Sequence, residues 1–115
     1  MALTSDIRTM LTSVSNVFIG TMPDTPDNSV CIYPSGGYAR SLSGTYLEEP
    51  TFQIIVRNTS YSAGETLCNT IKDLLHGKST TKILMIESQS DILNLGKNES
   101  NLNEWSLNFR CYYRR

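Results

Sequence analysis

The chain has 115 residues, of which 39% are apolar and 18% charged, and its formal net charge at pH 7 is −1. This length suits one domain that buries roughly 65% of its unfolded surface, which is enough for a core without metals or disulfides. A charge this close to zero excludes the strong electrostatic attraction that drives binding to polyanions. We therefore expect no specific nucleic-acid binding.

The sequence also lacks the patterns of a membrane span and of an export signal. Its apolar runs fall well short of the ~20 residues that cross a bilayer, and the first residues, MALTSDIRTML, show no basic segment followed by an apolar one. We expect no membrane partner. The three cysteines, Cys31, Cys68 and Cys111, are far apart and form no CxxC pair. They predict reduced, mostly buried thiols in a protein made in a cytoplasm.

Two segments carry apolar residues at helical spacing. Over Leu3–Val14 these residues fall at offsets of four, seven, eight and eleven, which predicts an amphipathic helix. A similar stripe over Ala63–His76 predicts a second helix. Ser62, followed three residues later by Glu65, predicts a capping box at its start, and Gly77 is its expected C-terminal stop.

Three stretches before the second helix are typical of strands. The first is the short apolar run Val17–Met22, and the second is SVCIYP, which Pro34 is expected to end. The third is EEPTFQIIVRN, in which Phe52, Ile54 and Val56 point to one side and the intervening residues to the other.

More strands are predicted after the second helix. KILMIES is apolar on both faces, so we expect it in the centre of the sheet, and DILNLGK continues it after a polar break. From Trp105 to Tyr113, apolar and polar residues alternate without interruption. This alternation predicts an antiparallel strand with one face on the core and one in solvent.

The order of these elements predicts an α+β fold, one domain over residues 1–115. We expect a mainly antiparallel sheet of four or five strands with two helices packed on one face. The other face would then carry Gln53, Ile55, Arg57, Asn108, Arg110 and Tyr112. This set has more apolar and aromatic area than a solvated face needs, which favours a component of an oligomer or larger assembly.

Candidate catalytic residues are few. His76, the one histidine, is expected at a helix end, where it would interact with free carbonyls and the helix dipole. Zinc normally needs three or four Cys or His ligands, so no metal is expected. Glu48 and Glu49 are adjacent and would point to opposite faces of a strand, and Cys68 has no nearby base. We expect no catalytic residue, no cofactor and no enzymatic activity.

The segment from Pro34 to Tyr46, PSGGYARSLSGTY, has the least regular pattern. It contains three glycines and three serines, yet also Tyr38, Arg40, Leu42 and Tyr46. One interpretation is a long flexible hairpin. The other is an arm that docks on another molecule, because aromatic residues and arginine dominate the binding energy of interfaces. Candidate interface residues are therefore Tyr38, Arg40, Leu42, Tyr46, Arg57, Arg110 and Tyr112.

Four stretches together carry a resemblance to a known family. They are VCIYPSGGY, EEPTFQIIVRN, SYSAGETLCNTIKDLLHG and the closing WSLNFRCYYRR. With the N-terminal helix and the order of elements, nearly the whole chain resembles the minor capsid proteins of tailed bacteriophages that infect Gram-positive bacteria. That group is similar to the tail terminators, also called tail completion or tail-to-head joining proteins.

The resemblance implies a structural virion protein in the tail or neck, assembled in the host bacterial cytoplasm. Its implied partners are itself, in a homo-hexameric ring, the tail tube protein and the head connector protein. The resemblance brings no catalytic residues. Two alternatives stay open: another virion part, such as a head-completion connector or a tail tube subunit, and a small ligand-binding or enzymatic α+β domain.

Overall fold

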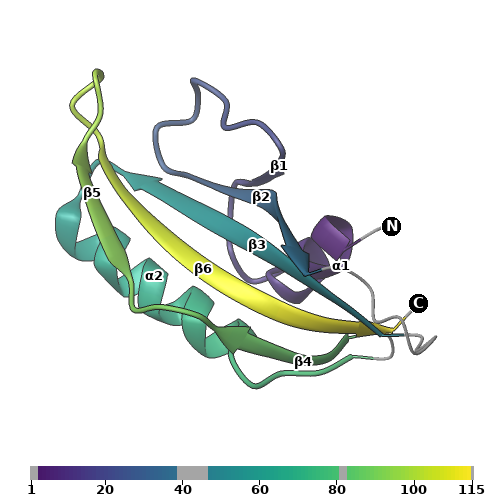
Figure 1. Ribbon diagram of the computed structural model, residues 1–115. Coiled ribbons are helices and arrows are strands. Elements are labelled where there is room, and N and C mark those ends of the chain that lie inside the picture. The colour runs from purple at the N-terminus through teal and green to yellow at the C-terminus, as the bar shows by residue number, and fades with distance from the viewer. Residues whose placement is uncertain (1–2, 39–46, 81–82, 115) are drawn as a thin grey trace.

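The computed structural model describes residues 3–38, 47–80 and 83–114, which form two helices and six strands (Figure 1). Arg40, Leu42 and Tyr46 lie outside the described residues. In chain order the elements are α1 (Leu3–Met10), β1 (Val17–Ile19), β2 (Ser29–Tyr38), β3 (Leu47–Asn58), α2 (Tyr61–Leu75), β4 (Ile83–Ser88), β5 (Leu93–Lys97) and β6 (Asn103–Arg114).

The six strands form one mixed sheet. The strand order is β1-β2-β3-β6-β4, and β5 pairs with the other half of β6. All described pairs are antiparallel except β1 with β2, which run parallel. The α+β class is confirmed, but the prediction of four or five strands was too low. The sequence pattern shows that a strand exists, but it does not show in which direction the neighbouring strand runs.

The position of β4 differs from the prediction. The two-sided apolar pattern of KILMIES predicted a central strand, but β4 lies at the edge of the sheet and pairs with β6. Ile83 and Ile86 are fully buried, whereas Leu84 and Met85 are 38% and 40% exposed. β5 continues this edge, as predicted. The second apolar side of β4 is therefore on the surface.

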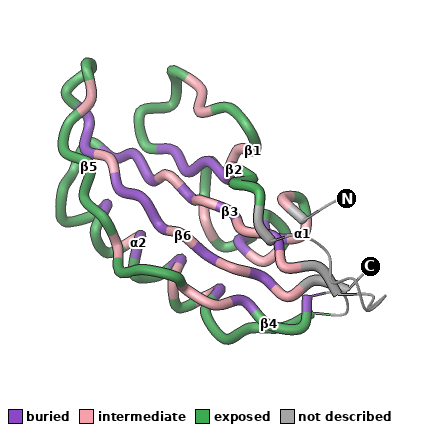
Figure 2. The backbone as a smooth tube through the Cα atoms, viewed as in Figure 1, coloured by how far each residue is buried: buried purple, intermediate pink, exposed green. Residues whose placement is uncertain are grey.

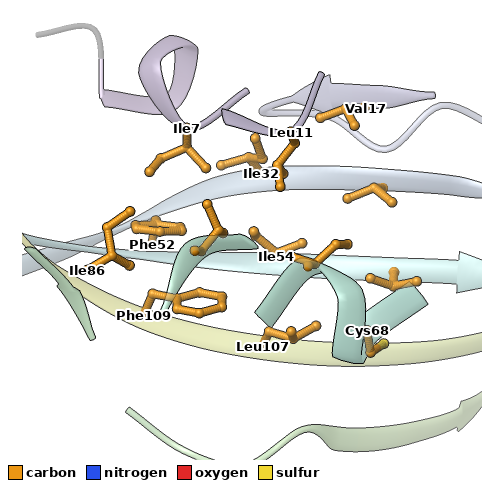
Figure 3. Close-up of a cluster of buried hydrophobic side chains, with 14 of the residues drawn as sticks. Ile7, Leu11, Val17, Ile32, Phe52, Ile54, Cys68, Ile86, Leu107 and Phe109 are labelled. Carbon is orange, nitrogen blue, oxygen red and sulfur yellow. The ribbon is translucent and has the colours of Figure 1, made fainter. Parts of the chain in front are cut away.

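The hydrophobic core lies between one face of the sheet and the two helices (Figure 3). Ile7 and Leu11 from the α1 region and Cys68, Ile71 and Leu75 from α2 belong to the same buried cluster. On the sheet, Ile32, Ile54 and Leu107 are partners across β2, β3 and β6, so they share one face. Both helices therefore cover this face, which we call the helix face.

The two helices begin and end at other residues than predicted. α1 ends at Met10, and Leu11 and Val14 belong to the turns that follow, although they still pack on the core. α2 starts at Tyr61, with Ser60 as the N-cap, whose Oγ accepts a hydrogen bond from the Ala63 N–H at 3.3 Å. Ser62 is thus not the cap. β3 ends at Asn58, so the cap falls at the first serine able to reach a free amide.

α2 approaches the sheet closely at Gly64. A Cβ atom at this position would overlap the six-membered ring of Trp105 on β6. The Trp105 side chain is 1% exposed and also contacts the Tyr61 ring at 5.4 Å between ring centroids. Gly64 therefore accommodates the indole ring of Trp105, which explains a glycine inside a helix where it costs about 1 kcal/mol relative to alanine.

β2 also continues beyond the predicted end. Pro34 was expected to stop the strand, but β2 runs through Pro34 to Tyr38, with an irregularity between Pro34 and Gly37. The neighbouring β1 pairs only as far as Ile32, so Pro34 has no partner strand on that side. A proline is tolerated there because the missing N–H breaks no hydrogen bond of the ladder. The hairpin of β2 and β3 is therefore paired out to Tyr38 and Glu49.

Candidate assembly surface

The side of the sheet opposite the helices carries most of the described candidate residues. We call it the open face. Cys31, Ile55 and Ser106 are partners across β2, β3 and β6, as are Tyr33, Gln53 and Asn108. The predicted face was therefore correct.

Hydrogen bonds between side chains fix the middle of the open face. The Gln53 Nε2 donates to the Ser106 Oγ at 2.8 Å, and Ser106 is only 1% exposed. The Asn108 Nδ2 lies 3.5 Å from the same oxygen. Since a buried hydroxyl without a partner would be costly, this contact determines how Gln53 lies on the sheet.

Arg57, a predicted interface residue, is 6% exposed and binds within the chain. Its partners lie in the β1–β2 loop, residues 20–28. The Nη2 donates to the Pro23 carbonyl at 2.6 Å and to the Pro26 carbonyl at 2.7 Å, and the Nε donates to the Asp27 carbonyl at 3.0 Å. Arg57 thereby holds the loop against one end of the open face. Arg57 would therefore affect an assembly contact indirectly, by holding the loop in place.

The first part of the same loop is held by Tyr33, whose hydroxyl accepts a hydrogen bond from the Met22 N–H at 3.1 Å. Cys31 lies next to Tyr33 on this face and is 0% exposed. Burial raises the pKa of the Cys31 thiol and of the Tyr33 hydroxyl. The sequence showed only a turn here, because contacts from the loop to Tyr33, 11 residues after Met22, and to Arg57, about 30 residues away, leave no local pattern.

The other described candidates lie at the opposite end of the open face. The Arg110 Nη1 is 3.5 Å from the Tyr112 hydroxyl, and the partners of these residues on β4 are Glu87 and Met85. Arg57 pairs with Glu104, six residues earlier on β6, so it lies about 20 Å from Arg110 at the rise of a strand. The structure thus brings Arg110 and Tyr112 together and keeps Arg57 apart. Tyr38 ends β2, and its side chain is outside the described part.

A row of exposed apolar side chains follows the edge formed by β4 and β5, and the predicted site did not include it. The row consists of Leu84, Met85, Leu93 and Leu95, which are 38–55% exposed. Figure 2 shows β5 in the colour of exposed residues throughout, whereas in β4 only Leu84 and Met85 are exposed and the other positions are buried or intermediate. We call this row the apolar edge. The sequence signal was present in LMI and LNL, but LMI led to the prediction of a central strand, and LNL to the prediction that the strand continues.

Few described groups suggest chemistry. The His76 Nδ1 accepts a hydrogen bond from the Ser88 N–H at 3.0 Å and so connects the end of α2 to β4, while the His76 backbone N–H donates to the helix carbonyl of Lys72 at 2.8 Å. Among the described residues, no group of three or more His, Cys, Asp and Glu side chains could hold a metal ion. Within the same residues, no helix is long and apolar enough to cross a membrane.

Comparisons with known proteins place this geometry in a family. A solved structure described as the virion of a native gene transfer agent particle contains a chain that superposes with a TM-score of 0.71 at 12% identity, covering 95% of this chain and 84% of the other. A second solved chain, whose name describes no function, has a TM-score of 0.57 at 16% identity, covering 98% and 88%. At these identities the likeness concerns the fold.

A search of curated proteins gave no match. The family described as bacteriophage tail terminator protein matches residues 2–115, which is nearly the whole chain. The chain therefore belongs to the bacteriophage tail terminator family and is a structural protein of a phage tail.

Proposed function

We propose that this protein closes the finished tail tube as a homo-hexameric ring and offers the ring's other side to the head connector protein, without catalysing a reaction. The observation that carries this proposal is the family match over residues 2–115. The fold supports it, because the sheet presents two different surfaces in addition to its core: the polar middle of the open face, where Gln53 binds Ser106, and the apolar edge. We place the protein in the tail or neck of the virion, assembled in the host cytoplasm.

Capping can be tested directly with purified components. Tail tube protein is allowed to polymerise with and without this protein, and tube lengths and ends are measured by negative-stain microscopy. The proposal predicts that added protein stops elongation and leaves a ring at one end. Unchanged tube growth contradicts it, and long stacks made by this protein alone would indicate a tube subunit instead.

We also propose that the segment between β2 and β3 contacts the tube or a neighbouring subunit through Tyr38, Arg40, Leu42 and Tyr46. Arg110 and Tyr112 on the open face complete this candidate surface. The test is a double substitution, Tyr38→Ala with Leu42→Ala. Two such anchors contribute roughly 2–4 kcal/mol to an interface, so we expect capping to be lost while the thermal midpoint of the subunit stays nearly unchanged.

The outcome separates three possibilities. Normal capping by the double variant shows that the segment is only a connecting loop. Loss of folding shows that the side chains belong to the core. A matched variant, Ser41→Ala with Ser43→Ala in the same segment, should cap as the wild type does.

A further inference from the structure

The two edges of the sheet carry different surface features. The apolar edge of β4 and β5 projects Leu84, Met85, Leu93 and Leu95 into solvent. At the other edge, α1 and β1 border an open groove of about 540 Å³, which is lined by four apolar residues, Leu11, Val14, Val17 and Phe18, and by four polar ones, Arg8, Thr9, Thr12 and Asn16. Figure 1 shows α1 and β1 on one side of the molecule and β4 and β5 on the other.

The two surfaces also lie on different faces. By register, Leu93 pairs with Ser106 and Met85 with Tyr112, both on the open face. The groove lies where α1 meets β1, at the border of the helix face. If copies were joined through these surfaces, the open-face side of the β4–β5 edge of one copy would lie on the helix-face side of the α1–β1 edge of the next copy.

Charge supports the same pairing. Arg8 lines the groove and is exposed. Between β4 and β5, the Asp91 side chain is 93% exposed, with Lys72 at 3.6 Å as its partner in the chain. The Ile92 N–H and Lys72 lower the pKa of Asp91, so it is negative at neutral pH. A cation beside the groove and an anion in the middle of the apolar edge fit one another.

We propose that the apolar edge of one subunit docks into the α1–β1 groove of a second copy of this chain. The proposal rests on the proposed ring and identifies the two surfaces that would form it. The contact is heterologous: each copy uses its edge toward one neighbour and its groove toward the other. Repetition of such a contact closes a ring when its rotation divides a full turn.

The arrangement also explains why exposed apolar residues persist on a sheet edge. Unpaired edges invite uncontrolled strand pairing, and bulges are one means of preventing it. Both strands here carry register irregularities, between Ile83 and Met85 and between Asn94 and Gly96. The edge is therefore poorly suited to continuous backbone pairing with another strand. Side-chain docking into a groove remains available to it.

The test uses two variants that each remove one half of the contact. The edge variant carries Leu93→Glu and Leu95→Glu, and the groove variant carries Thr9→Glu and Thr12→Glu. All four positions are exposed, so both subunits should fold, which circular dichroism checks. The matched controls are Thr66→Glu with Thr70→Glu on α2, and Leu93→Met with Leu95→Met, which keeps the edge apolar.

Masses are then measured by sedimentation up to millimolar concentration. We expect the wild type and both controls to form a closed oligomer and each test variant to associate at least about a hundredfold more weakly, as for loss of two interface anchors. An equimolar mixture of the two test variants should give dimers of twice the 12.9 kDa subunit mass and nothing larger. The contact within each dimer uses the intact groove of the edge variant and the intact edge of the groove variant, so only altered surfaces remain free.

Several results overturn the proposal. They are a wild type that stays monomeric, a groove variant that assembles as the wild type does, and a mixture that stays monomeric. An isologous contact of edge with edge would produce the second of these. Tail capping is measured separately: capping by both variants refutes this contact but not the proposed function, while closed rings that fail to cap refute the function but not the contact.

Discussion

The two faces of the sheet are stabilised in different ways. On the helix face, the rings of Phe52 and Phe109 stack at 5.2 Å, and Trp105 fills the space left by Gly64. On the open face, stability comes from directed hydrogen bonds, above all those from Arg57 to the β1–β2 loop. The comparison indicates that changes of volume on the helix face should affect the whole fold. Loss of a donor on the open face should instead affect the loop first.

The largest effect is expected on the helix face at Gly64. Gly64→Ala adds a Cβ that must displace the Trp105 ring, and overpacking a core costs about 1–3 kcal/mol or more. Since the added Cβ overlaps a fully buried ring, we expect an overpacking cost of about 3–4 kcal/mol, and the gain of about 1 kcal/mol from the helix propensity of alanine leaves a fall of about 2–3 kcal/mol in the free energy of unfolding, measured in urea titrations. Combining it with Trp105→Leu should cost less than the sum of the single changes, because the leucine leaves room. An additive result would show that the two residues do not interact.

Arg57→Met tests the open face with nearly the same side-chain length. The loop loses its donors, but its carbonyls can turn to water, so we expect a loss of about 2 kcal/mol rather than the sum of several charged hydrogen bonds. Hydrogen exchange should accelerate in residues 20–28 and stay unchanged in α2. Arg57→Lys keeps the positive charge but lacks the planar guanidinium group, so its stability and its rate of hydrogen exchange should lie between those of the wild type and Arg57→Met. Equal acceleration throughout the chain would contradict a local role.

Cysteine labelling sharpens the comparison, because Cys31 lies on the open face and Cys68 and Cys111 on the helix face. All three are buried, so the native wild type should react slowly with a thiol reagent, and the unfolded, unreduced protein should show three free thiols. In Arg57→Met, Cys31 should react on the order of tenfold faster, since Gly20 and Thr21 of the β1–β2 loop contact its sulfur and the loop is loosened. If all three accelerate together, the variant has loosened the whole fold.

A further effect concerns alkaline pH. Burial raises the pKa of Cys68 and of Cys111 to about 12, from an ordinary value of 9.0. Above pH 9 the unfolded chain therefore releases protons that the folded chain retains, so stability should fall as the pH rises from 9 toward 12. Denaturant midpoints at pH 8 and pH 10 measure this, and Cys68→Ala with Cys111→Ala should flatten the slope. If the two substitutions left the fall of stability with pH unchanged, groups other than Cys68 and Cys111 would be responsible for it.

The sequence predicted the helix face well, because burial on one side of a strand or helix leaves a regular period. The alternation that starts at Trp105 identified Trp105, Leu107, Phe109 and Cys111 correctly as core residues. The stripe of α2 identified Ile71 and Leu75, but its first residue, Ala63, is exposed. Predicted boundaries failed where one residue decides: Ser60 rather than Ser62 caps α2, and Pro34 lies within β2. In the first case the end of β3 at Asn58 decides where α2 begins, and in the second the short β1 leaves Pro34 without a partner strand on one side.

The candidate site was less predictable. Periodicity placed Arg57 on the open face, but nothing local showed that a loop some 30 residues earlier would surround its guanidinium. The apolar edge was missed although its local pattern is clear. Apolar residues on both sides of β4 are typical of a buried strand, so the pattern predicted that both sides would be buried within the subunit. In the structure the second side of β4 is exposed, which the pattern does not reveal.

The central place of β6 has a consequence for how the protein is made. In the described part of the chain, β6 pairs with β3, β4 and β5, and it follows all of them in sequence. While the ribosome is still synthesising the earlier strands, β1, β2 and β3 can pair with one another, but β4 and β5 have no partner strand. The complete sheet therefore forms only after β6 has emerged. A chain that stops before β6 would lack the strand that holds β4 and β5, so it would not form the apolar edge.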